Sequence, residues 1–200
     1  MSKVRERILD VATQLFYQRG IQAVGVDAII TKADVARMSF YRHFKSKEGL
    51  VVACLLRRDA AIRAWFEAEV NRLAPHPKSR TLAVFDALAK RFATEHYRGC
   101  GFINTMAEMP DRAGAAHRSA AQHKRRFEEY FAKLLREEGL AETHAPDLLL
   151  LFDGATVAAA RTGSAAPAFS AKRMAAALLG LPTPRAAKRP AAAPRRTGAA

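Results

Sequence analysis

The sequence predicts an all-α protein. Apolar side chains recur at spacings of three and four along most of its 200 residues, which is the period of an amphipathic helix. No segment of useful length alternates apolar and polar residues as a half-buried strand does, and glycine and proline interrupt the helical pattern where helices end. We expect about nine helices, divided between a three-helix unit over 1–50 and a larger helical domain over 51–181.

The composition limits the classes of protein that fit. Half of the residues are hydrophobic, which is enough for folded cores, and the net charge of +14 suits a polyanionic partner without specifying one. Two cysteines are too few for a disulfide framework or a zinc cluster. No signal peptide and no apolar run of membrane-spanning length is recognisable, so we expect a cytoplasmic protein that does not enter the membrane.

The first three helices are short and closely spaced. A first helix is expected over 4–19, ended by Gly20 as a C-cap, and a second carries Ile29 and Ile30. A third starts near Ala36. A long connecting helix follows behind Ser46 as its N-cap and continues until the prolines near 75–77.

The remaining helices form the larger domain. The apolar period predicts helices over 82–92 and 102–109, then a long helix over 116–134 that ends at Gly139. Thr143 is expected to cap the next helix, which becomes rich in small residues over 154–160 and so permits close approach of another helix. A last helix is expected over 169–179. Beyond it, residues 182–200 are rich in Pro, Ala and Arg and predict a disordered basic tail.

The segment between the second and third helices has the pattern of a helix-turn-helix. Ala33 is small, Asp34 tolerates a left-handed backbone, and Val35 is an apolar plug. Phe40 and Phe44 then face inward on the third helix, which leaves its other positions toward the outside.

These outward positions carry side chains that suit DNA. Arg37 and Arg42 can each present a bidentate fork to guanine, Ser39 is adaptable, and Met38 can contact a thymine methyl group. A second set suits phosphate oxygens, with Lys47 placed where the helix dipole also favours an anion. This set comprises Tyr41, His43 and Lys47.

The run FYRHFKSKEGL at 40–50 resembles the Leu-Tyr-x-His-Phe-x-Ser-Lys-x-x-Leu pattern of TetR-family transcriptional regulators, and the resemblance extends over about 4–50. It implies a symmetric homodimer with an N-terminal DNA-binding domain and a variable helical domain that binds a small ligand and releases DNA. It also implies dimerisation through the last two helices. RGCGFIN at 98–104 is a weaker match to a subfamily.

The chain departs from the family pattern at three positions. Asp34 stands where the turn often has Gly, and Ala36 stands where a hydroxyl residue often caps the recognition helix. Gly25 replaces a frequent Ser or Thr at the start of the second helix. By its position it remains a candidate DNA contact, although it lacks a side chain to reach a phosphate.

Aromatic and sulfur-containing residues of the larger domain are either core or the lining of a ligand pocket. The pocket candidates are Trp65, Phe66, Phe92, Cys100, Phe102, Met106, Phe127 and Asp153. Cys100 is either a redox sensor or a buried small hydrophobe, and Asp153 is either a buried polar contact or a ligand partner. The spacing of His96, His117, His123 and Cys100 matches no metal-ligand pattern, so no metal and no cofactor are expected.

The leading hypothesis is a repressor whose dimer places two recognition helices in successive major grooves of a palindromic operator and is released by a small molecule. A constitutive DNA-organising protein without ligand input is a second hypothesis, and an enzyme using the helical domain is a third. No nucleophile elbow, phosphate loop or paired carboxylates favour the enzyme. The tail either attracts phosphate or only solubilises the chain, and its basic residues are Arg185, Lys188, Arg189, Arg195 and Arg196.

Overall fold

The computed structural model describes residues 2–76, 79–95 and 97–182, which form α-helices, the 3₁₀ turn Glu142–His144 and connecting segments, with no strand among them. The all-α prediction is therefore confirmed. The α-helices are α1 (Lys3–Arg19), α2 (Val26–Ala33), α3 (Arg37–His43), α4 (Lys47–Leu73), α5 (Arg80–Phe92), α6 (Gly101–Glu108), α7 (Ala115–Glu138), α8 (Ala145–Thr162) and α9 (Ala166–Leu178). His96 and the basic tail residues lie outside the described residues.

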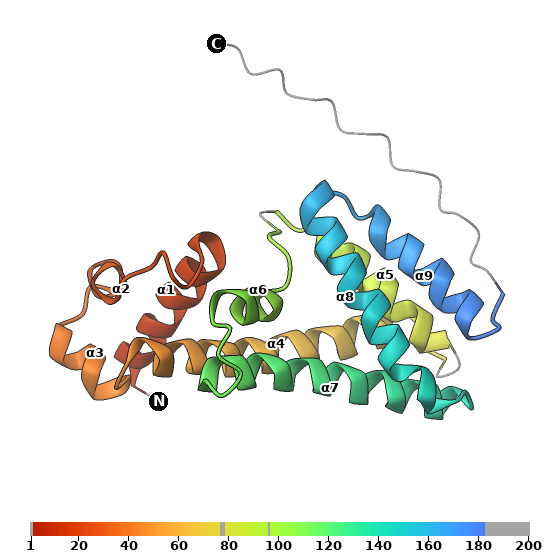
Figure 1. The fold of residues 1–200 in the computed structure, drawn as a ribbon, viewed down its shortest axis with the longest axis horizontal. Helices are drawn as coiled ribbons and strands as arrows, with labels where there is room; N and C mark the ends of the chain where they lie inside the picture. Colours follow the sequence, from red (N-terminus) through yellow and green to blue (C-terminus); the bar gives the residue numbers. More distant parts are fainter. Residues whose placement is uncertain (1, 77–78, 96, 183–200) are drawn as a thin grey trace, which may run out of the picture.

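Helices α1, α2 and α3 form a small unit at one end of the elongated molecule (Figure 1). Its core contains Ile8, Leu15, Ile29 and Phe40, all of them almost completely buried. Leu50 and Cys54 from the start of α4 complete this core. The connecting helix α4 therefore belongs to both halves of the chain, since its later turns pack into the larger domain.

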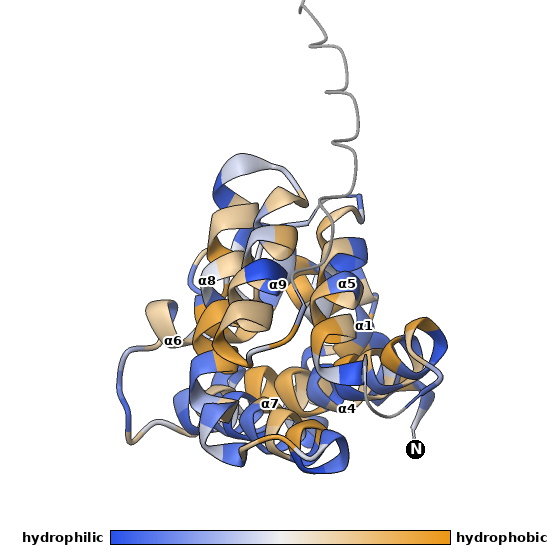
Figure 2. Ribbon diagram, turned by 90° about the vertical axis from the view of Figure 1, so that its right-hand side faces the viewer, coloured by the Kyte–Doolittle hydropathy of each residue, from blue (hydrophilic) through white to orange (hydrophobic). Residues whose placement is uncertain are grey.

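The larger domain is arranged around two long helices, α4 and α7, which run side by side with α5, α8 and α9 grouped at the far end (Figure 1). Apolar residues of all five helices form the buried core between them, and the outer turns of α4 and α7 are coloured mostly hydrophilic in Figure 2. Phe66 of α4 contacts Phe127 of α7, with ring centroids 5.2 Å apart, and Phe152 of α8, at 5.6 Å. This aromatic cluster is the centre of the domain core.

A third apolar cluster connects the two halves. Ile21, from the segment after α1, packs with Val51 and Leu55 of α4, Phe102 of α6 and Ala120 of α7. Helix α6 packs on α7, and Glu108 at its end accepts a hydrogen bond from the Gln22 N–H after α1, so α6 contacts both halves of the chain.

Two expected helix starts are wrong. Thr143 does not cap α8, because it lies inside the 3₁₀ turn Glu142–His144, and α8 follows with His144 at its N-cap position and no side-chain cap. Helix α9 begins at Ala166, three residues before the expected start at 169. Pro167 lies in its first turn, where the missing N–H costs little, and thereby favours the earlier start.

Candidate nucleic-acid interface and adjoining cavities

The turn before α3 has the geometry of a helix-turn-helix. Asp34 adopts a left-handed conformation with φ 48° and ψ 61°, as the sequence predicted, and its N–H donates back to the end of α2. The guanidinium of Arg7 donates to the Asp34 carbonyl at 2.6 Å, which ties the turn to α1. Ala36 is the extended N-cap residue of α3, and no side chain caps the helix there.

Helix α3 buries one face and exposes the other. Phe40 is completely buried and Phe44 nearly so, which fixes the helix against α1. Met38 is 80 % exposed, and the side chains of Arg37, Tyr41 and Arg42 are also exposed. An exposed methionine of this kind has no role in the protomer core. The outward face is thus free to meet a large partner.

Arg37 is exposed but paired. Its Nη2 atom lies 2.5 Å from Oδ1 of Asp27 in the first turn of α2, and both side chains are mostly exposed. The pair orients the Arg37 fork along the α2–α3 edge. Such a surface pair contributes little to stability, about 0–1 kcal/mol, so DNA can compete for the guanidinium.

The candidate phosphate contacts lie around the ends of α3 and α4. Lys47 is partly buried in the first turn of α4, where Ser46 Oγ accepts a hydrogen bond from the Gly49 N–H at 3.0 Å and confirms the predicted cap. Gly25 is the exposed N-cap residue of α2. His43 is partly buried, and its Nε2 is enclosed without a hydrogen-bond partner among the described residues, so a phosphate contact would use Nδ1.

The proposed pocket residues do not converge on one cavity. Phe66, Cys100 and Phe127 line a cavity of about 30 Å³ at the centre of the larger domain. Trp65 instead lines a more open groove of about 370 Å³ between α1, α4 and α5. Four candidates line neither space: Phe92, Phe102, Met106 and Asp153. Asp153 forms an ion pair with Lys124 of α7 at 2.5 Å, so it acts as a polar contact between α7 and α8.

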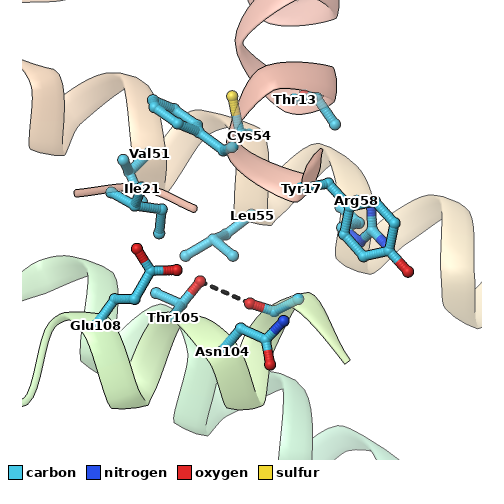
Figure 3. A pocket seen from close by; sticks show the side chains of 12 residues that line it. Thr13, Tyr17, Ile21, Val51, Cys54, Leu55, Arg58, Asn104, Thr105 and Glu108 are labelled. Carbon is cyan, nitrogen blue, oxygen red and sulfur yellow. Dashed lines mark hydrogen bonds between the residues drawn. The ribbon is translucent and has the colours of Figure 1, made fainter. Parts of the chain in front are cut away.

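A second small cavity, of about 40 Å³, lies between α1, α4 and α6 (Figure 3). Tyr17, Leu55 and Arg58 line one side, and Asn104 and Glu108 line the other. A cavity of this size has room for a few waters at most. Glu108 also accepts a hydrogen bond from the Gln22 N–H at 2.9 Å, which connects α6 to the segment after α1.

Two arginines that sequence reasoning missed, Arg58 and Arg91, both line the central cavity and the open groove. A signal was present in the sequence, because Arg58 lies at the apolar register position between Leu55 and Ile62, and Arg91 follows Leu88 by three residues. A charged residue in an apolar register faces inward.

No three His, Cys, Asp or Glu side chains in the described ranges gather where they could hold a metal ion. Within the same ranges, each helix is too short or too polar to traverse a lipid bilayer.

Residues 8–54 match the sequence family described as "Bacterial regulatory proteins, tetR family". The HTH-type transcriptional repressor NemR of Escherichia coli K12 is 31 % identical over 108 residues, which are 54 % of each protein. The match thus spans about half the length of this curated relative.

Two solved structures resemble nearly the whole chain. A TetR-family transcriptional regulator from Streptomyces coelicolor, SCO4454, is 31 % identical with a TM-score of 0.81, covering 90 % of this chain and 89 % of its own. The reduced form of E. coli NemR is 26 % identical with a TM-score of 0.74, covering 92 % of this chain and 100 % of its own.

Proposed function

Because the chain belongs to the TetR family of bacterial transcriptional regulators, we propose that it is a repressor that binds a palindromic operator as a homodimer and is released by a small molecule. The observation that carries the proposal is the exposed face of α3. The buried side chains of Phe40 and Phe44 fix this helix to the rest of the three-helix unit. Its exposed face carries Met38, Tyr41 and Arg42.

The residues of this face divide into two roles. We assign base recognition in the major groove to Arg37, Met38, Ser39 and Arg42. Phosphates on either side of the major groove would be bound by a second set, which positions α3 without adding sequence preference. This set comprises Tyr41, His43, Lys47 and the backbone at Gly25. Arg37 would exchange Asp27 for a base edge when the protein binds.

Helices α8 and α9 are the proposed dimer interface. Leu150 is 74 % exposed and Met174 is 59 % exposed, although both are large and apolar. Both line an open groove of about 530 Å³ on this face, together with Gly154 and Ala158. The small residues would let the matching helices of a second copy approach closely, and the exposed apolar side chains would then be buried.

A ligand could act on α3 through contacts between the two halves of the chain. The Tyr17 hydroxyl of α1 donates to the Gly99 carbonyl at 3.3 Å and accepts from the Arg98 N–H at 2.9 Å, just before α6. Arg57 of α4 binds Asp10 of α1 at 2.8 Å. A ligand that shifts α4 or α6 would therefore change the spacing of two α3 helices in a dimer.

Alanine substitution tests the two roles on α3 and α4. Starting from operator fragments selected from genomic DNA, Arg42→Ala should relax base preference and cost about 1–3 kcal/mol at one position. Lys47→Ala should weaken binding to all DNA and reduce the magnitude of the salt slope by about one. Arg125→Ala, on the exposed side of α7, is the matched control and should leave both unchanged.

The measurement is DNA affinity as a function of salt, for operator and scrambled duplexes. Equal affinity of the unsubstituted protein for both duplexes across the salt range would refute the proposal.

The small internal cavities favour one alternative, a constitutive DNA-binding protein without ligand input. Cavities of about 30 and 40 Å³ do not hold a drug-sized molecule as they stand. The open groove lined by Trp65 is larger, at about 370 Å³. If no compound that binds the purified protein changes its affinity for the operator, the protein is a constitutive DNA-binding protein without ligand input.

A further inference from the structure

Arg58 of α4 and Arg91 of α5 are partly buried, and neither forms an ion pair with a carboxylate of the described residues. The Arg58 guanidinium carbon lies 4.3 Å from the centre of the Tyr17 ring, and its Nε is enclosed without a hydrogen-bond partner. The Arg91 guanidinium carbon lies 5.7 Å from the centre of the Trp65 ring. Both side chains line the open groove of about 370 Å³.

The two charges act on each other. Burial lowers the pKa of Arg91, and the positive charge of Arg58 lowers it further. No acidic residue lines the groove or the central cavity that adjoins it. Arg57 also lines the groove, but its charge is balanced by Asp10 and Glu6 of α1. Asp59, the next residue on α4, is turned toward α7 and is already bound by other side chains.

An unpaired, partly desolvated guanidinium is costly, and two of them in one space cost more. Stacking on Tyr17 and Trp65 recovers part of that cost but satisfies none of the N–H donors. An anion placed between the two guanidinium groups would accept charge-assisted hydrogen bonds from both. The arrangement therefore favours the binding of an anion.

The rest of the groove is suited to an apolar, flat molecule. Ala61, Ile62 and the Trp65 ring form its wall, and Thr13 adds one hydroxyl. A small inorganic anion would leave this wall in contact with water. An aromatic carboxylate would place its charge on the arginines and its rings on the wall.

We propose that the groove between α1, α4 and α5 is the effector site and that it takes an aromatic carboxylate, held by Arg58 and Arg91. The proposal rests on the regulator function proposed above and specifies the chemical class of its ligand. Arg58 packs on Tyr17, which is hydrogen-bonded to the segment before α6. Drawing the Arg58 guanidinium onto a ligand would loosen its contact with α1.

Calorimetric titration of the full-length protein with 2-naphthoate and with its neutral analogue 2-naphthamide tests the site without DNA. We expect naphthoate to bind about tenfold more tightly than the amide, or better, because only the carboxylate forms charge-assisted hydrogen bonds. Equal binding of the two compounds, no binding of naphthoate, or displacement of naphthoate by equimolar inorganic phosphate would each overturn the proposal.

Substitutions then locate the site. Arg58→Gln and Arg91→Gln should each weaken naphthoate binding about tenfold or more, whereas amide binding should change little. Lys90→Gln is the matched control, since it removes the same charge next to Arg91 from a side chain that is paired with Glu69. Arg58→Lys keeps the charge without the fork and should recover only part of the affinity. Naphthoate affinity that survives both glutamine substitutions in folded protein would contradict the assignment.

The effect of naphthoate on operator affinity is measured in a separate experiment. Naphthoate should lower the operator affinity of the unsubstituted protein and leave that of Arg58→Gln unchanged. If the protein shows no operator preference, the proposed function fails while the calorimetric result still decides the site. If naphthoate binds through both arginines but does not change operator affinity, the assignment of the groove as an effector site is overturned.

Discussion

Asp59 of α4 is almost completely buried and accepts hydrogen bonds from three side chains. His123 Nδ1 donates at 2.7 Å, Arg126 Nη1 at 2.5 Å and Arg63 Nε at 3.1 Å. Burial alone would raise the pKa of Asp59, but the hydrogen bonds from His123 and Arg63 outweigh it and lower the pKa. The carboxylate is therefore charged in the fold and joins α4 to α7.

His123 is neutral in this cluster. Burial lowers its pKa to about 4 despite the hydrogen bond to Asp59, and the charge of Lys124 acts in the same direction. Its ring is also stacked on Phe102 of α6, with centroids 3.5 Å apart. His123 thus fixes α6 and α4 onto α7, in the part of the protein that connects its two halves.

This pKa predicts a loss of stability in mild acid. In the unfolded protein His123 takes up a proton near pH 6.5, whereas in the folded protein it does so only near pH 4. The free energy of unfolding therefore decreases as the pH falls from about 6.5 to 4. Between pH 7 and 5 the contribution amounts to about 2 kcal/mol. Urea denaturation at several pH values should show this decrease in the free energy of unfolding for the unsubstituted protein.

His123→Gln should reduce the slope of the unfolding free energy against pH, because glutamine can still donate a hydrogen bond to Asp59 but does not titrate. His117→Gln is the matched control on the same helix and should retain the slope of the unsubstituted protein. A pH profile of His123→Gln with unchanged slope would show that another group is responsible.

At the scale of helices and turns, the α2–α3 turn depends on Asp34. Its φ of 48° lies in the left-handed region, and it is the one non-glycine residue with positive φ in the described ranges. Its carbonyl receives the hydrogen bond from Arg7, and a glycine would retain that acceptor. Asp34 therefore bears backbone strain that glycine would relieve.

Asp34→Gly should raise the free energy of unfolding by about 0.5–1 kcal/mol, because the strain relieved exceeds the entropy that glycine loses on folding. Asp34→Val should lower it by about 1–2 kcal/mol, since a β-branched side chain is disfavoured at positive φ. Asp34→Asn should leave the free energy of unfolding close to that of the unsubstituted protein. Equilibrium denaturation checks all three, and a destabilised Asp34→Gly would mean that the aspartate side chain has a role beyond the turn.

The sequence predicted most of the helices because their apolar residues face a core at regular spacing. It misplaced the start of α9, since Ala166, Pro167 and Ala168 carry no large apolar residue and show no period. The division at residue 50 stays a prediction, because Leu50 and Cys54 of α4 complete the N-terminal core while the helix continues into the larger domain.

The site was predictable in part. The exposed face of α3 followed from the inward spacing of Phe40 and Phe44, which is local information. The groove was not predictable, because α1, α4 and α5 meet there only in the folded chain. Helical period also cannot separate an aromatic residue packed in the core, such as Phe102, from one that lines a cavity, such as Phe66.

At the scale of the whole molecule, the distance between the two α3 helices of the proposed dimer would depend on how its protomers associate. Helix-turn-helix dimers bind two half-sites about 34–36 Å apart or a multiple of that distance, so in the proposed dimer dimerisation and operator binding would be coupled. The exposed apolar face of α8 and α9 lies at the end of the molecule opposite α3 (Figure 1). A dimer formed there would leave both α3 helices free.

Gly154 offers a sharp test of this dimer, because a Cβ added there meets no atom within 4 Å in the protomer. Gly154→Leu should therefore fold normally, with helix propensity slightly improved, but its side chain would occupy the space that a second copy needs. We expect a monomer in analytical ultracentrifugation and a loss of operator affinity of at least about tenfold, since only one half-site is then held at a time. Leu56→Glu is the matched control, because Leu56 is also apolar and 52 % exposed but lies on α4 and does not line the groove of α8 and α9. A dimeric Gly154→Leu protein, or a monomeric Leu56→Glu protein, would place the interface elsewhere on the surface.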